Sequence, residues 1–165
     1  MIWTHELYKQ DLLTVAETDI PWGDLRNKRI LVSGARGMIG SFLIDVIMLR
    51  NELFGDAIEV FALGRNEKEA KKRFYPHLDD GKLHIVPHNI NEPLPAIEGV
   101  DYIIHAASNT HPVAYSSDPI GTITTNIFGT YNLLNFAVEN RVPRFMLLSS
   151  VEIYGENRGD VDFFD

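Results

Sequence analysis

Apolar residues along this chain alternate between short continuous runs and longer stretches with helical spacing. A continuous run such as Ile30–Val32 predicts a strand that is buried on both faces. Apolar residues that recur every three or four positions, such as Ile39, Phe42, Leu43 and Val46, predict a helix with one apolar face. The strands predicted in this way are Ile30–Val32, Ile58–Leu63, Leu83–Val86, Asp101–Ala107 and Arg144–Ser150, and the helices are Met38–Leu53, Glu67–Phe74 and Ile120–Glu139.

Strands that are separated by helices favour right-handed crossovers and a parallel sheet. The predicted fold is therefore α/β, a Rossmann-type parallel sheet with helices on both faces. Such a sheet usually has six strands, and the pattern predicts five. We interpret the chain as a truncated part of a longer protein.

Residues 1–27 precede the alternating pattern and are predicted to be an N-terminal extension of the domain 28–165. A short helix is expected over Gln10–Thr18 and a turn at Pro21–Asp24. The apolar residues of the extension are expected to pack on the domain; they are Trp3, Leu7, Leu12, Leu13 and Val15.

A glycine-rich turn, Gly34-Ala35-Arg36-Gly37-Met38-Ile39-Gly40, joins the first strand to the first long helix. Gly34 permits a tight turn, Gly37 lets backbone approach a pyrophosphate, and Gly40 allows close packing of the helix. The amide groups at the start of that helix, including those of Met38 and Ile39, would face the phosphates. This context favours a dinucleotide site over a plain glycine-rich loop, and the absence of Gly-Lys-Ser/Thr excludes a P-loop.

The end of the second strand bears on the choice between NAD and NADP. An NAD site usually carries an acid there, but this chain has Gly64-Arg65-Asn66. The Arg65 guanidinium can pair with a 2′-phosphate, and Arg36 offers a second phosphate contact. NADP is therefore slightly preferred as the cofactor; the alternative is that Arg65 is a solvated loop residue.

The composition of the chain argues against several classes of function. The formal net charge is -8, which argues against a general nucleic-acid surface. There is no cysteine, so neither a disulfide framework nor a thiolate metal site is available. No membrane span or secretory signal is apparent, and the expected location is cytoplasmic. The basic cluster Lys68, Lys71, Lys72 and Arg73 is interpreted as the solvated face of a short helix, and His105 as a packed residue at a strand end.

Four motifs in order resemble those of the extended short-chain dehydrogenase/reductase family, specifically its NAD-dependent nucleotide-sugar epimerases, dehydratases and UDP-glucuronate decarboxylases. The resemblance covers Lys28 to about Gly155. The motifs are the turn at Gly34, Gly37 and Gly40, then His105-Ala106-Ala107-Ser108, Asn126-Ile127-Phe128-Gly129-Thr130-Tyr131-Asn132-Leu133-Leu134, and Ser149-Ser150-Val151-Glu152-Ile153-Tyr154-Gly155.

The resemblance implies roles for particular residues. Ala106, Ala107 and Ser108 would lie beside the nicotinamide ribose, and Asn126 would help to order the active site. Asn89 stands where the family commonly has an acid at adenine, with Ile90 beside it, so this contact departs from the family's pattern. Ser150 matches the catalytic Ser/Thr. Glu152 matches a glutamate of the dehydratases and decarboxylases, while Val151 replaces the general-acid aspartate of the dehydratases; the alternative for Glu152 is a solvated loop residue.

The implied activity is hydride transfer from the sugar C4 to a bound NAD(P), giving a transient 4-keto sugar. Epimerisation or decarboxylation fits better than dehydration. The resemblance also implies that the chain is the N-terminal part of the whole protein and that the C-terminal substrate-binding part is absent. The family's Tyr-x-x-x-Lys pair is missing from these residues, so this chain is expected to bind dinucleotide without turnover. The alternatives are a non-catalytic NAD(P) sensor and a reductase of small carbonyls. A nucleotide-sugar partner and a homodimer through residues 120–139 are implied, and Asn109–Pro119 is expected to be a loop beside the cofactor.

Overall fold

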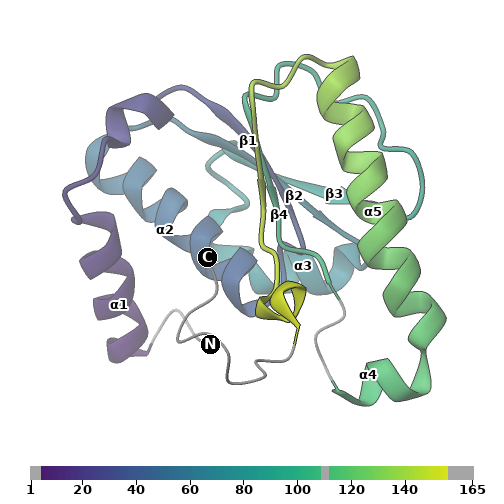
Figure 1. Ribbon diagram of the computed structural model, residues 1–165. Coiled ribbons are helices and arrows are strands. Elements are labelled where there is room, and N and C mark those ends of the chain that lie inside the picture. Colours follow the sequence, from purple (N-terminus) through teal and green to yellow (C-terminus); the bar gives the residue numbers. More distant parts are fainter. Residues whose placement is uncertain (1–4, 109–111, 156–165) are drawn as a thin grey trace.

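A computed structural model describes residues 5–108 and 112–155 of the 165-residue chain. Its centre is a parallel sheet with the strand order β3-β2-β1-β4-β5 (Figure 1). The predicted Rossmann-type α/β fold is confirmed. The strands are β1 (Arg29–Ser33), β2 (Glu59–Gly64), β3 (Leu83–Pro87), β4 (Tyr102–His105) and β5 (Arg144–Leu147).

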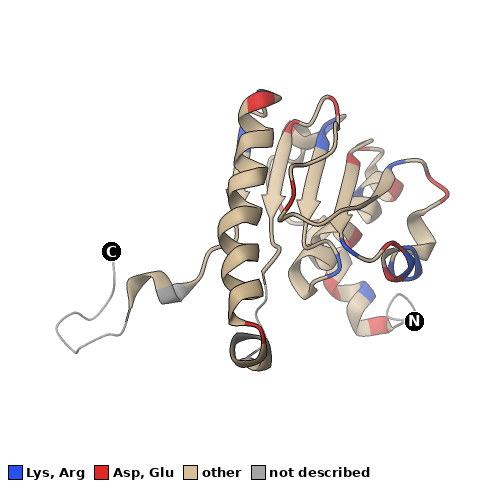
Figure 2. Cartoon of the chain, turned by 90° about the vertical axis from the view of Figure 1, so that its right-hand side faces the viewer, with Lys and Arg blue, Asp and Glu red and all other residues tan. Residues whose placement is uncertain are grey.

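Helices cover both faces of this sheet. The helices α2 (Met38–Phe54) and α3 (Glu67–Arg73) lie on one face, and α5 (Pro119–Glu139) lies on the other (Figures 1 and 2). A short turn of 3-10 helix, η3 (Tyr75–His77), follows α3. Since the sheet order runs outward in both directions from β1, right-handed crossovers place α2 and α5 on opposite faces.

The core has two layers because the sheet is apolar on both faces. Ile30, Val32 and Val60 pack toward α2, while Leu31 and Ile103 pack toward α5. The predicted burial of the first strand on both faces is thus confirmed. Strands β4 and β5 end earlier than predicted, so residues 106–107 and 148–150 leave the sheet at its carboxyl end.

The N-terminal extension forms α1 (Glu6–Ala16), earlier than the predicted helix, and η2 (Trp22–Leu25). Leu12 and Val15 pack on α2 as expected, but Leu7 and Leu13 are exposed, 65% and 39%. The expectation for these two leucines was wrong because the helical repeat turns them away from α2. Trp3 lies outside the described residues.

Two buried charged residues of the domain, Asp56 and Arg50, bind the extension. Asp56, fully buried, accepts hydrogen bonds from Arg50 Nε (2.7 Å) and Arg26 Nε (2.9 Å). Arg50 Nη1 also donates to the Ala16 carbonyl, 2.9 Å away, and its guanidinium lies over the rings of Trp22 and Phe54. Burial acts to raise the pKa of Asp56, but the hydrogen bonds from the two arginines outweigh it and lower that pKa.

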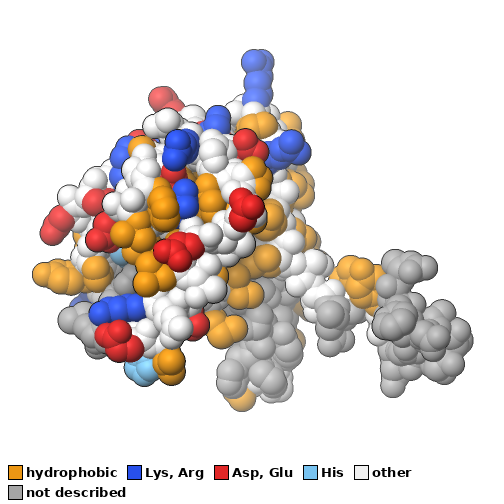
Figure 3. Space-filling model, turned by 90° about the vertical axis from the view of Figure 1, so that its left-hand side faces the viewer, with side chains coloured by type: hydrophobic (Ala, Val, Ile, Leu, Met, Phe, Trp, Pro, Cys, Tyr) orange, Lys and Arg blue, Asp and Glu red, His pale blue; other side chains and the backbone are white. Residues whose placement is uncertain are grey.

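A second polar cluster corrects one sequence prediction. Arg73 is not on a solvated face: its guanidinium donates to buried Asp45 in α2 and to the Tyr8 hydroxyl in α1 (3.1 Å). Asp45 needs this partner because an unpaired buried carboxylate is costly. On the face seen in Figure 3, basic and acidic side chains are interspersed among apolar ones.

The predicted loop Asn109–Pro119 contains a helix, α4 (Pro112–Ser117). Proline suits the first position of a helix, and the Ser116 and Ser117 hydroxyls donate to the Val113 carbonyl within it. The loop prediction was wrong over this helix, and residues 109–111 lie outside the described ranges.

The outer face of α5 is apolar and exposed. In Figure 2 this helix is tan along almost its whole length, which marks residues that are neither acidic nor basic. The expected homodimer through this helix stays a prediction. Within the described parts of the chain, no helix combines the length and apolar character that crossing a membrane requires. The exposed apolar residues of α5 are Ile120, Ile123, Ile127, Phe128, Tyr131, Leu134 and Val138.

Candidate dinucleotide-binding site

The glycine-rich turn between β1 and α2 has no room for a side chain at two positions. Gly34 has φ +68°, and a Cβ there would lie 2.6 Å from the Ala106 carbonyl carbon and oxygen. A Cβ on Gly40 would lie 2.5 Å from the Gly34 carbonyl oxygen. Gly40 therefore lets α2 pack directly on the turn, and Gly34 lets the turn pack on the residue after β4.

The amino terminus of α2 lacks a capping side chain among the described residues. Gly37 is the N-cap, and its amide donates to the Gly34 carbonyl (2.8 Å). Among the described residues no side chain caps this helix, and its first turn has no acid. The first-turn amides and the positive end of the helix dipole therefore favour a negatively charged group.

A cavity of about 750 Å³ opens beside this turn, along the carboxyl end of the sheet. Its walls come from the turn and from the segments that follow β2, β3 and β4, together with one residue of α5. The predicted cofactor residues that line it are Gly34, Arg36, Gly37, Arg65, Asn89, Ile90, Ala106, Ala107 and Ser108.

Several other predicted residues lie outside the lining. Met38, Ile39 and Gly40 belong to the first turn of α2 and are not among the residues that line the cavity. Asn126 is exposed, and its neighbour Thr125 lines the cavity instead, because one residue of a helix rotates the side chain by roughly 100°.

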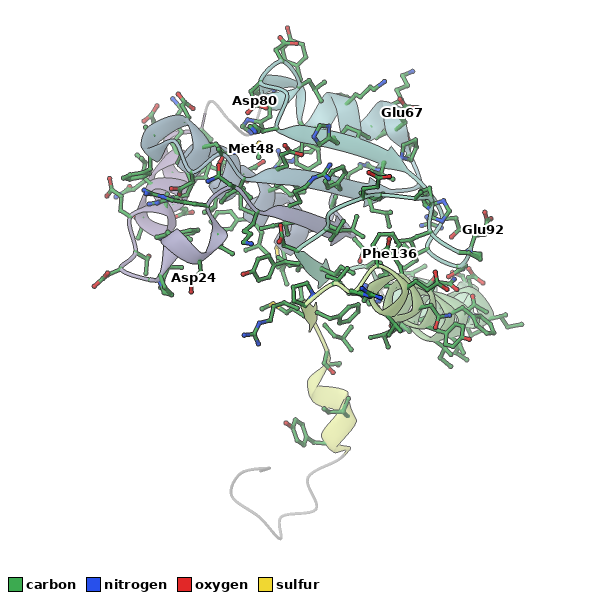
Figure 4. The ribbon with its side chains drawn as sticks, turned by 90° about the horizontal axis from the view of Figure 1, so that it is seen from above. Asp24, Met48, Glu67, Asp80, Glu92 and Phe136 are labelled. Atoms are coloured by element: carbon green, nitrogen blue, oxygen red, sulfur yellow. The ribbon has the colours of Figure 1, made fainter. Side chains whose placement is uncertain are left out.

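The predicted catalytic segment is not part of the cavity either. Ser150 is exposed, and its carbonyl accepts from the Ile153 amide (3.3 Å) in the 3-10 turn η4 (Val151–Tyr154). In Figures 2 and 4 this turn lies apart from the body of the domain. The backbone of Glu152 is in η4, but its side chain is outside the described part of the structure.

Sequence reasoning missed several lining residues. Most of them lie within a few residues of a predicted strand end, so position relative to the carboxyl edge is the signal that could have found them. Asn66 also caps α3 by accepting from the Glu69 amide (3.1 Å). The missed residues are Ala35, Leu63, Gly64, Asn66, Glu67, His88 and Thr125.

The charges around the cavity are unequally paired. Arg36 Nη2 lies 4.0 Å from Glu69 Oε2, and Glu67 pairs with Lys71 (2.5 Å). Within the residues that the structure describes, Arg65 pairs with no acidic side chain. The carboxylate of Glu67 is thus partly neutralised, while Arg65 keeps its positive charge available at the cavity wall.

His105 lies behind the cavity and is 1% exposed. Its Nδ1 is 2.7 Å from Ser33 Oγ and its Nε2 is 3.0 Å from Thr130 Oγ1. Burial lowers the pKa of His105, so the ring is held neutral. The prediction of a packed strand-end residue is confirmed. No group of metal-ligating side chains occurs within the described ranges.

Comparison with known proteins identifies the family of the chain. The sequence model of the NAD dependent epimerase/dehydratase family matches residues 30–164. The chain belongs to this family. UDP-glucuronic acid decarboxylase 2 of Arabidopsis thaliana is 37% identical over 143 residues, covering 83% of this chain and 29% of that protein. UDP-glucuronic acid decarboxylase 1 of Danio rerio is 38% identical over 131 residues, covering 78% and 29%.

Solved structures of other proteins share the fold of this chain. A double mutant of the dTDP-glucose 4,6-dehydratase DesIV from Streptomyces venezuelae, with NAD bound, superposes on the present chain with a TM-score of 0.61 at 29% identity. The match covers 79% of the present chain and 42% of the dehydratase chain. A UDP-N-acetylglucosamine 4-epimerase from Methanobrevibacter ruminantium has the same fold, with a TM-score of 0.64 at 19% identity, covering 85% and 43%. The present chain spans less than half the length of these proteins.

The residues present fit the cofactor that the family uses. Gly34 and Gly37, which carry no side chain, line the cavity and leave room for a diphosphate near the start of α2, and the small residues Ala106 and Ala107 leave room for a ribose. Two guanidinium groups, of Arg36 and Arg65, line the same cavity. A bound dinucleotide would supply hydride acceptance and return.

Proposed function

We propose that the cavity binds NAD(P), with its pyrophosphate on the turn between Gly34 and Gly40. The observation that carries this proposal is the coincidence of three features at one place. They are an uncapped helix start, a turn in which Gly34 and Gly40 have no room for a side chain, and a cavity along the carboxyl end of a parallel sheet. Ligands of open α/β sheets bind at this edge.

The adenosine end would lie between the segments after β2 and β3. Asn89 and Ile90 would contact adenine, while Ala106, Ala107 and Ser108 would lie beside the nicotinamide ribose. Each of these residues lines the cavity, which supports the assignment. Thr125, one residue before the expected Asn126, would contribute the α5 side of the wall.

We propose further that the site prefers NADP to NAD. Arg65 supports this preference, because it stands where a ribose-binding acid is usual and pairs with no acid among the described residues. Arg36 would assist but is shared with Glu69. A guanidinium can hold a phosphate through two parallel hydrogen bonds.

The experiment that tests the preference is calorimetric titration of the chain with NADP and NAD. Arg65→Ala is expected to weaken NADP binding by about tenfold or more and to leave NAD binding nearly unchanged, since one charge-assisted interaction is lost. Lys68→Ala is the matched control: it removes a charge three residues further along, from an exposed side chain outside the cavity. Equal weakening for both cofactors, or none, would contradict the assignment.

For the whole protein we propose a nucleotide-sugar enzyme that works through a transient 4-keto sugar. The support is the family membership and the similarity to UDP-glucuronic acid decarboxylases. Ser150 would hydrogen-bond the reacting sugar oxygen, and Glu152 would act as an acid/base or orient the sugar. Because the printed 165 residues contain no Tyr-x-x-x-Lys, we expect this chain by itself to bind dinucleotide without turnover.

A further inference from the structure

A chain of hydrogen bonds crosses the domain directly behind the cavity. It starts at Ser33, the last residue of β1, passes through the imidazole of His105 at the end of β4, and reaches Thr130 in α5. Thr130 Oγ1 then donates to the Asn126 carbonyl, 2.6 Å away. Both Ser33 and His105 are fully buried, so water cannot substitute for these bonds.

The direction of each bond can be worked out from the chemistry of the groups. A carbonyl only accepts, so the single hydroxyl proton of Thr130 goes to Asn126. Thr130 Oγ1 must then accept from His105 Nε2–H. Because burial keeps the ring neutral, Nδ1 carries a lone pair and accepts from the Ser33 hydroxyl. One tautomer, with the proton on Nε2, satisfies the whole chain.

The ends of this chain are attached to the cavity walls. Ser33 precedes Gly34, and its carbonyl accepts from the Ala106 amide (3.2 Å). Asn126 follows Thr125, which forms the α5 side of the cavity. The gap between the turn and β4 is tight, since a Cβ on Gly34 would meet Ala106 at 2.6 Å. A small shift of either element would therefore change the shape of the site.

We propose that His105 is a positioning residue for the dinucleotide cavity: its imidazole, bonded to Ser33 and Thr130, fixes the glycine turn, the end of β4 and the inner side of α5 relative to one another. The inference rests on the proposed NAD(P) binding and adds a residue that contacts no part of the ligand. His105 acts through Gly34, Ala106 and Thr125, which line the cavity.

Two threonines of α5 provide a matched test. Thr130 and Thr122 each donate to the carbonyl four residues earlier, at 2.6 and 3.0 Å, but only Thr130 also contacts His105. Valine replaces threonine at nearly equal volume and removes only the hydroxyl. Calorimetric titration with NADP should show binding about three- to tenfold weaker in Thr130→Val, the size of one hydrogen bond. Thr122→Val should bind like the wild type, and Thr130→Ser should restore binding.

Imidazole ¹⁵N spectra give a readout that a merely structural role would not move. The wild-type chain should show His105 as the neutral Nε2–H tautomer, and Thr130→Val should shift it toward a mixture of tautomers. This measurement needs no ligand and remains available on the wild type and Thr130→Ser if Thr130→Val does not fold.

Three outcomes separate the claims. An Nδ1–H tautomer in the wild type, or equal NADP affinity of Thr130→Val and Thr122→Val, would overturn the role of His105 and leave the proposed function standing. Failure of the wild type to bind either dinucleotide would overturn the proposed function, and this inference with it.

Discussion

Polar groups cluster on two sides of the parallel sheet: the amino edge, where the strands begin, and the carboxyl edge, where they end. The pairing of these groups differs between the two sides. At the amino edge, Asp56 is satisfied by Arg50 and Arg26, and Asp101 accepts from Lys28 Nζ (3.1 Å) and the Arg29 amide (2.9 Å). At the carboxyl edge, the start of α2 has no capping side chain and Arg65 has no acidic partner among the described residues.

The difference in pairing suits two roles: the paired groups at the amino edge satisfy one another within the fold, and the unpaired groups at the carboxyl edge are available to a ligand. Figure 4 shows Glu67, from the cavity wall, at one end of the sheet, and Met48 and Asp80 toward the other. Met48 and Asp80 line a second cavity, of about 540 Å³, between the end of α2 and the segment before β3. A buried charge depends on its partner, and removing that partner destabilises the domain, whereas unsatisfied donors around a cavity favour an anion.

The largest effect is expected from breaking the amino edge. Asp56→Ala leaves the buried Arg50 guanidinium without its carboxylate, which should cost about 3–5 kcal/mol in the free energy of unfolding. Urea unfolding measures this loss. NADP affinity, measured under conditions where the variant is folded, should stay within about twofold of the wild type, since Asp56 is remote from the cavity. A selective loss of affinity would contradict the division between the edges.

Two glycines at opposite ends of α2 sharpen the comparison. Gly34 and Gly55 both have positive φ, +68° and +64°, but a Cβ on Gly55 would meet nothing within 4 Å. Gly55→Ala should cost about 1 kcal/mol in unfolding free energy, for backbone strain alone. Gly34→Ala adds a clash with Ala106 and should cost about 2–4 kcal/mol and abolish NADP binding. Similar costs and similar affinities in the two variants would show that the tight turn has no special role.

A smaller effect is expected from pH at the amino edge. Burial lowers the pKa of His77 to about 4, against about 6.5 in an unfolded chain. The imidazole of His77 therefore binds a proton more readily in the unfolded chain than in the folded one. As a result, the free energy of unfolding is highest above pH 6.5 and falls as the pH drops toward 4. Between pH 7 and pH 5 the wild type should lose about 2 kcal/mol more than His77→Gln in urea unfolding. The same pH dependence in both proteins would contradict this assignment.

The sequence was sufficient for the features whose causes are local. The strand–turn–helix at Gly34 was predicted because a buried apolar run, three spaced glycines and an amphipathic stretch each act within a few residues. Ala106, Ala107 and Ser108, after β4, were identified through the family resemblance rather than through a local pattern, and they line the cavity.

Features set by distant partners could not be predicted. Arg73 looked solvated because its partners, Asp45 and Tyr8, lie 28 and 65 residues away in the chain. Thr125 was passed over for Asn126 because the rotation of α5 is fixed by its packing on the sheet. The link from Ser33 to His105 spans 72 residues and appears only when β1 and β4 pair.

The central claim is that a dinucleotide lies on the turn at the carboxyl edge, and glycine amides report on both edges at once. In ¹H–¹⁵N spectra of the chain titrated with NADP, Gly34, Gly37 and Gly64, which line the cavity, should show the largest shifts. Gly55 and Gly81, whose surroundings are open, should hardly move. Shifts that are absent at saturating NADP, or that are largest at Gly55 or Gly81, would contradict the account.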